Sequence, residues 1–164
     1  MMDDSLMKQL REHLVKLLRS SEAHIGFDKT LADLPQELRG ARPDGFAHSI
    51  WQLLEHLRIA QWDILEFSRD AGHISPKWPE GYWPEREAPG DEAAWNESLA
   101  KFRADLHTME ELVASPENDL FIPITHGSGQ TILREALLVA DHNAYHLGQV
   151  MLVRKMLESG AFIT

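Results

Sequence analysis

The residues with the clearest chemical potential are two histidines near the C-terminus, His142 and His146. They are four residues apart, so on an α-helix both rings project from one face, one turn apart. Two imidazoles at this spacing can bind one divalent cation. The apolar positions Leu147 and Met151 lie close to the same face, and burying two unpartnered imidazoles would be costly. The alternative is a pair of ordinary core histidines, and the spacing by itself leaves both interpretations open.

A third ligand has to come from another part of the chain, and His56 is the best candidate. It shares a helical stripe with Leu53, Ala60 and Phe67, which predicts an inward-pointing ring. His48, two turns earlier, is expected at the rim of such a site. Three neutral histidines leave a coordination position open, which is typical of a catalytic metal site. Taken alone, His56 fits a buried core histidine better, and it is the combination with the later pair that favours a metal.

Several other chemistries are excluded or disfavoured. The chain has no cysteine, so any metal must be held by histidine, carboxylate or backbone oxygen. No glutamate precedes a histidine by three residues, which argues against a di-iron carboxylate bundle. The glycine-rich phosphate loops, the zinc-protease H-E-x-x-H pair and the G-x-S-x-G nucleophile turn are all absent.

Composition narrows the range of partners. The chain has 164 residues and a net charge of −10, so nucleic acid and anionic lipid would be repelled. We therefore expect a small-molecule substrate and no nucleic-acid or membrane partner. The N-terminal residues do not resemble a signal peptide, and no apolar run is long enough to span a membrane. These features predict a cytoplasmic protein with a single domain over residues 1–164.

Apolar residues recur at helical spacing in four segments, which must position these histidines. The spacing predicts helices over about 3–20, 47–69, 91–114 and 130–158. His56 falls on the second predicted helix, and His142 and His146 fall on the fourth. The connections 21–46, 71–90 and 115–129 are long, which indicates a bundle with crossovers, and 71–90 is expected to be an ordered crossover or lid. A short helix is expected at Thr30–Leu34 and an extended piece at Phe121–Ile124. The expected fold is therefore all-α, a four-helix bundle with long crossover loops.

Some further residues are candidates for supporting roles. Asp63 lies seven residues after His56, and Glu135 lies seven before His142, so either could orient an imidazole or act as a base. Both could equally be solvated or paired with arginine at a bundle end. Gln149, three residues beyond His146, is expected to line the pocket. Among the tryptophans, Trp78 and Trp83 of the long 71–90 connection either anchor this loop or cover the site.

Two short stretches resemble a known family. Residues 49–57 (SIWQLLEHL) and 141–149 (DHNAYHLGQ) are similar to the second-helix and last-helix signatures of the DinB/YfiT-like superfamily. The resemblance implies a four-helix bundle with a divalent metal held by His56, His142 and His146. Imidazole ligands suit Zn²⁺ and Ni²⁺. Members of this superfamily often pair, so the resemblance also implies a possible homodimer.

The resemblance implies a range of activities. Some members look like S-transferases that use a low-molecular-weight thiol such as bacillithiol or mycothiol, and some are related to a mycothiol-dependent isomerase. The favoured hypothesis is a metal-dependent thiol S-transferase that acts on a small electrophile. The nucleophile would be a metal-bound thiol or a metal-bound water, and the second choice corresponds to a metal-dependent hydrolase. Two alternatives are a non-catalytic stress protein that binds a small ligand or metal, and a bundle whose histidines only pack in the core.

Overall fold

A computed structural model describes residues 3–20 and 23–160, and its regular structure is helical. The four long helices are α1 (Asp4–Leu18), α3 (Ile50–Arg69), α4 (Glu92–Ala114) and α5 (Ile132–Ser159). The short elements are the helix α2 (Phe27–Leu31) and the 3₁₀ turns η1 (Gln36–Leu38) and η2 (Glu80–Tyr82). The prediction of an all-α bundle is confirmed, and each predicted long helix has its counterpart.

The helix ends follow from local side-chain chemistry. The side chains of Asp3, Ser49, Asp91 and Thr131 each accept a hydrogen bond from a backbone N–H in the first turn of the helix that follows. Ser49 forms a capping box with its helix, which explains why α3 begins three residues after the predicted start at 47. Helix α5 ends at Gly160, whose φ of 62° is readily adopted by glycine.

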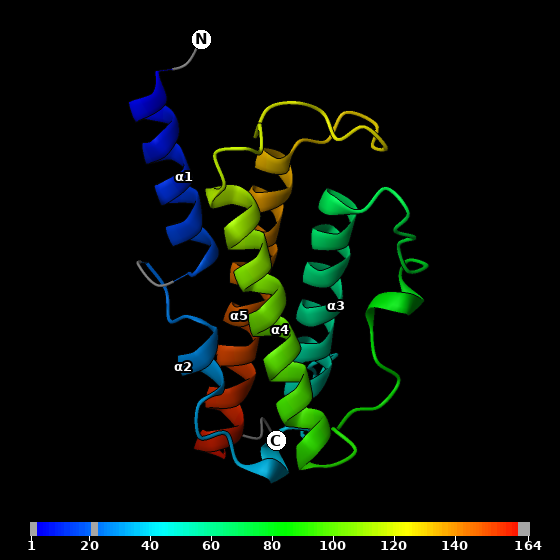
Figure 1. Ribbon diagram of the computed structural model, residues 1–164. Coiled ribbons are helices and arrows are strands. Elements are labelled where there is room, and N and C mark those ends of the chain that lie inside the picture. The colour runs from blue at the N-terminus through cyan, green and yellow to red at the C-terminus, as the bar shows by residue number, and fades with distance from the viewer. Residues whose placement is uncertain (1–2, 21–22, 161–164) are drawn as a thin grey trace.

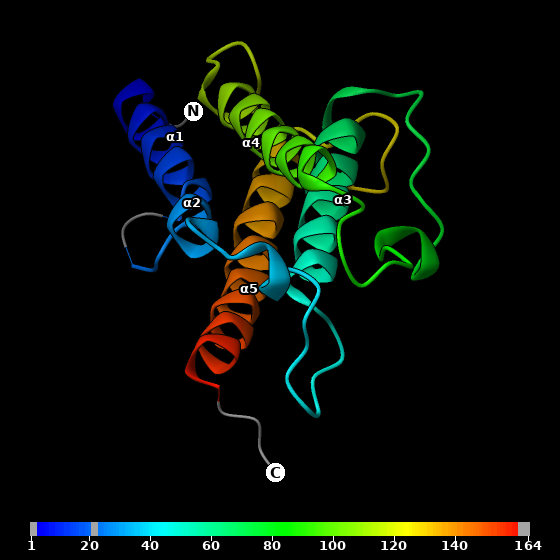
Figure 2. The same ribbon diagram turned by 90° about the horizontal axis from the view of Figure 1, so that it is seen from below.

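The long helices form a bundle with one crossover along its side. Helix α3 packs against both α4 and α5, and α1 packs against the same two helices from the other side. Helices α1 and α5 run in one direction, whereas α3 and α4 run in the other (Figure 1). Because α3 and α4 are parallel, the chain has to return along the bundle between them. Residues 70–91 make this return beside α3 (Figures 1 and 2). We call this connection the strap.

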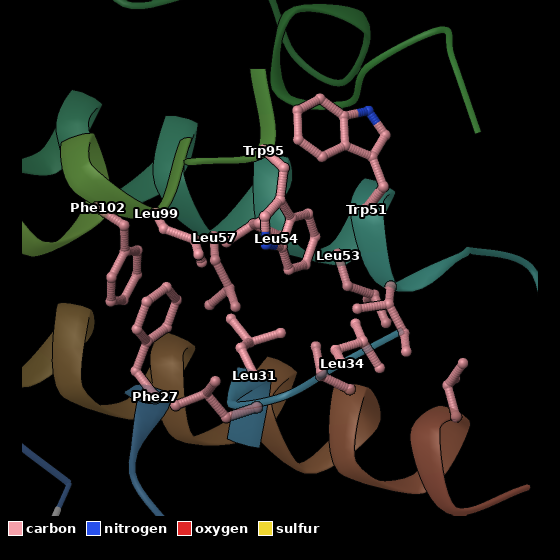
Figure 3. Packing of buried hydrophobic residues seen from close by; sticks show 14 residues of the cluster. Phe27, Leu31, Leu34, Trp51, Leu53, Leu54, Leu57, Trp95, Leu99 and Phe102 are labelled. Carbon is pink, nitrogen blue, oxygen red and sulfur yellow. The ribbon is translucent and has the colours of Figure 1, made fainter. Parts of the chain in front are cut away.

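One part of the core lies at the level of α2. Leu54 and Leu57 of α3 are completely buried there, together with Phe102 of α4 (Figure 3). Phe27 of α2 stacks on Phe102 with ring centroids 3.9 Å apart. Helix α2 begins three residues before the predicted Thr30–Leu34 helix and ends at Leu31, because Ala32 leaves the helical conformation with a ψ of 137°. Asp33 then adopts a positive φ of 53°. The packed interface between α3 and α5 is the surface that carries the candidate histidines.

The piece expected to be extended at Phe121–Ile124 contains an isolated bridge between Pro123 and Thr131 and no named strand. None of the helices in the described ranges combines the length and the apolar character that a membrane span requires.

Candidate metal centre

The structure brings His56, His142 and His146 together at the interface of α3 and α5. Each offers one ring nitrogen, and these atoms all lie within 4.8 Å of one another. The Nε2 atoms of His56 and His142 are 3.1 Å apart. Two imidazoles on one tetrahedral zinc ion have nitrogens roughly 3.3 Å apart, given Zn–N bonds of about 2.0–2.1 Å. The separation of the His56 and His142 nitrogens is therefore close to what a shared cation requires, and the His146 nitrogen lies within 4.8 Å of both.

The helices explain this convergence. His56 is 2% exposed and follows the inward stripe of α3, beside the buried Leu53 and Leu57. His142 and His146 are one turn apart on α5, on the side that faces α3. His146 is buried, and His142 is half-buried. The long helices thus fix three side chains that are up to 90 residues apart in sequence.

A backbone carbonyl fixes the tautomer of His56. Its Nδ1 lies 3.0 Å from the carbonyl oxygen of Tyr82, in the strap. A carbonyl oxygen can only accept, so Nδ1 carries the proton and donates it. The Nε2 lone pair of His56 is then free and faces His142. This is the form in which a histidine binds a metal through Nε2.

His146 is oriented in the same way by a side chain. Its Nδ1 lies 2.8 Å from Oε1 of Gln149, one turn further along α5. The ring donates this proton to the amide oxygen, so its Nε2 keeps a free lone pair. Gln149, expected to line the pocket, therefore contacts one of the three imidazoles directly.

His142 has a hydrogen-bonding conflict. Among the described residues, its Nδ1 is one of the few buried polar side-chain atoms without a partner. If Nε2 carries the proton, it can donate to His56, but Nδ1 then buries an unpaired lone pair. If Nδ1 carries the proton, two Nε2 lone pairs face each other across 3.1 Å. A cation between these lone pairs removes the repulsion, so the residues present fit a metal ion.

A proton is a poor substitute for such a cation at neutral pH. Burial is the main cause that lowers the pKa of His56 to about 4, and the Tyr82 carbonyl only partly offsets it. Burial also lowers the pKa of His142 to about 4, with smaller contributions from His146 and His56. The pKa of His146 is lowered by burial as well, against the opposing effect of Gln149. The three imidazoles are therefore neutral near pH 7, as metal binding requires.

The strap covers one side of the cluster with an aromatic ring. Trp83 stacks on His56 with ring centroids 3.9 Å apart and planes 3° apart. His48 stacks on Trp83 at the same centroid distance, so the indole lies between two imidazoles. Trp78, the other candidate cover, is 67% exposed, and its recorded ring contact is with Tyr82. Of the two tryptophans, it is Trp83 that shields a histidine from solvent.

Asp63 anchors the strap and does not touch the histidine cluster. One carboxylate oxygen accepts a hydrogen bond of 2.6 Å from the Tyr82 hydroxyl. The other lies 2.7 Å from Nε2 of His73. Burial and the neighbouring Asp63 raise the pKa of Tyr82 to about 12, so its hydroxyl stays a donor. Asp63 therefore acts on His56 only through Tyr82, the residue whose carbonyl orients that ring.

Glu135 pairs with Arg134 and makes no hydrogen bond to the three histidines. It is 2% exposed on the first turn of α5, where Oε1 accepts a hydrogen bond of 2.6 Å from Arg134. Its recorded contacts do not include any of the three histidines. Sequence reasoning missed Tyr82, because it contributes a backbone oxygen that any residue type could supply. No sequence pattern indicated a role for His73, the second partner of Asp63.

The comparisons with known proteins give one match. A family model described as the DinB superfamily matches residues 7–150. This range contains the three histidines, Asp63, Gln149 and the whole strap. No curated protein and no solved structure matches the chain significantly.

Proposed function

The chain belongs to the DinB superfamily, and we propose that it binds one divalent cation through the Nε2 atoms of His56, His142 and His146. We further propose that it is a metal-dependent enzyme, a thiol S-transferase acting on a small electrophile. Zn²⁺ and Ni²⁺ are the candidate ions, because both suit imidazole ligands.

One observation carries the metal-binding proposal. The Nε2 atoms of His56 and His142 are 3.1 Å apart, while the Nδ1 proton of His56 is committed to Tyr82. In a metal-free core either tautomer of His142 is costly, because it leaves an unpaired Nδ1 lone pair or two Nε2 lone pairs that repel each other. A cation converts the repulsion into coordination.

The reaction class rests on what the neighbouring residues are free to do. A cation held by His56, His142 and His146 would lower the pKa of a thiol bound beside it and so would supply a thiolate near pH 7. The thiol sulfur then bonds to the electrophilic carbon, the leaving group departs with its electron pair, and the thiol proton passes to solvent. Asp63 and Glu135 are engaged by other side chains. The thiol route needs no carboxylate base beside the histidines. Hydrolysis by metal-bound water is the alternative.

The chain's own residues provide orientation and shielding in this proposal. Tyr82 and Gln149 hold two imidazoles with their Nε2 atoms free. Trp83 covers the face of His56 and keeps water from that side. Neutral imidazoles near pH 7 allow loading without loss of protons from the ligands.

The test combines loading with turnover. Zinc-loaded protein is incubated with a low-molecular-weight thiol and a chlorinated aromatic electrophile, and thioether formation is followed by absorbance. We expect turnover that falls at least about 100-fold in His142→Ala. His107→Ala, which removes an exposed histidine of α4, is the matched control and keeps full turnover. Equal turnover in His142→Ala would contradict the proposal, and ester cleavage without thiol would identify a hydrolase instead.

A further inference from the structure

Two buried side-chain amides, one on α3 and one on α5, are linked by hydrogen bonds to the backbone of α4. Gln61 of α3 is completely buried, and Asn143 of α5 is 2% exposed. Gln61 Nε2 donates a hydrogen bond of 2.8 Å to the backbone carbonyl of Phe102 in α4. Asn143 Nδ2 donates a hydrogen bond of 2.8 Å to Gln61 Oε1. Side chains of α3 and α5 are thus tied in sequence to a fixed point on α4.

The backbone carbonyl of Phe102 determines the direction of both hydrogen bonds that the two amides make. The Phe102 carbonyl can only accept, so Gln61 must present its NH₂ group to it and its oxygen to Asn143. Asn143 must in turn present its NH₂ group to Gln61. Its Oδ1 is then left as an acceptor, and this atom is buried and has no partner among the described residues. Burying an acceptor in this way is costly unless a donor meets it.

The neighbouring residue supplies a nitrogen that lacks an acceptor. His142 Nδ1 is also buried and unpartnered, and it belongs to the residue before Asn143. When His142 uses Nε2 to bind a cation, its single proton has to sit on Nδ1. That proton needs an acceptor.

We infer that Asn143 and Gln61 are positioning residues that hold His142 as its Nδ1–H tautomer, with Asn143 Oδ1 as the acceptor, so that Nε2 is available to the cation. This inference rests on the proposed metal site. It completes the orientation of the cluster, since Tyr82 and Gln149 already account for His56 and His146. It also makes the backbone of α4 part of the site, although α4 contributes no ligand.

The test compares zinc affinity and ring-proton signals. Zinc binding is measured by competition with a chromophoric chelator, and ring protons are followed by long-range ¹H–¹⁵N NMR of the zinc-loaded, ¹⁵N-labelled protein. We expect Asn143→Leu to weaken zinc binding about 10- to 100-fold. We also expect it to remove a hydrogen-bonded, slowly exchanging Nδ1–H signal of His142, while the signals of His56 and His146 persist.

Two further variants separate positioning from general stability. Gln61→Met should weaken zinc binding less than Asn143→Leu and should add no further loss in the double variant, because both act through one acceptor. Thr30→Val is the control for general stability. It removes a buried hydroxyl that donates to the Gly26 carbonyl, so it should lower the unfolding temperature without changing zinc affinity.

The outcomes distinguish this inference from the proposed function. Wild-type protein that cannot bind zinc would overturn the proposed metal site itself. Zinc binding that is tight in the wild type and within about twofold of it in Asn143→Leu would overturn only the role of Asn143. Strictly additive losses from Gln61→Met and Asn143→Leu would show independent effects and would overturn the coupling between the two amides.

Discussion

The three imidazoles differ in what holds them, and this decides how much of the cluster could be predicted. His142 and His146 follow from their spacing on a helix, and His56 follows from its place on an apolar stripe. Tyr82 could not be predicted, because its backbone oxygen has no sequence signature and reaches His56 only through the path of the strap. The role inferred for Asn143 depends on a carbonyl of another helix, so no pattern around position 143 indicates it.

The pKa values of the ligands predict a specific pH dependence for the metal-free protein. The pKa of His56 and of His142 is about 4 in the folded state, against an ordinary value of 6.5. Between these values the unfolded chain binds more protons, so the free energy of unfolding falls as the pH falls from 6.5 towards 4. Two such groups give a slope of about 2 kcal/mol per pH unit near pH 5.

Urea denaturation in the presence of a chelator, at several pH values between 4 and 7.5, measures this slope. A His56→Asn and His142→Asn double variant is the comparison, because it removes both titrating rings and keeps the carboxylates. We expect a clearly shallower slope in the double variant. Parallel curves for the two proteins would show that the folded histidines titrate normally.

Among the elements, the strap is the one whose position the sequence could not indicate. Periodicity predicts the long helices to within a few residues, because each buries an apolar face and begins at a capping side chain. Whether α3 and α4 are parallel depends on tertiary packing, and the strap follows from that arrangement (Figure 1). The composition of residues 71–90 indicates an ordered connection but not which face of the bundle it covers.

The hydrogen bond between Tyr82 of the strap and Asp63 of α3 can be removed to test whether the strap supports the metal site. Removing the Tyr82 hydroxyl, in Tyr82→Phe, leaves Asp63 with one donor and should cost about 1–2 kcal/mol of stability. The carbonyl that orients His56 should then be held less firmly, so zinc affinity should fall several-fold. Chelator competition and denaturation measure the two effects.

Trp83 provides a second signal for the same variant. Its ring stacks on His56, so a loosened strap should change tryptophan fluorescence as well. Tyr145→Phe is the control, because this tyrosine is 66% exposed on α5 and outside the strap. An equal fall in zinc affinity in Tyr82→Phe and Tyr145→Phe would show that the strap does not support the metal site.

For the molecule as a whole, a cation at the cluster would join the two helices α3 and α5 across the bundle. Binding to the folded state alone adds stability that grows with free metal concentration, about 2.7 kcal/mol at 100 times the dissociation constant. We therefore expect the unfolding temperature to rise on addition of Zn²⁺ and to fall again with chelator. His146→Ala should abolish this response and His107→Ala should keep it; a shift of equal size in both would indicate nonspecific binding. The pairing of two chains stays a prediction.

The most direct test of metal binding by the three histidines is elemental analysis of untagged protein, repeated on His56→Ala. This variant removes the ligand that comes from α3 and leaves the pair on α5 intact. We expect about one divalent ion per chain in the wild type and loss of that ion in the variant. Full metal content in His56→Ala, or a folded wild-type protein that cannot be loaded with Zn²⁺ or Ni²⁺, would contradict this expectation.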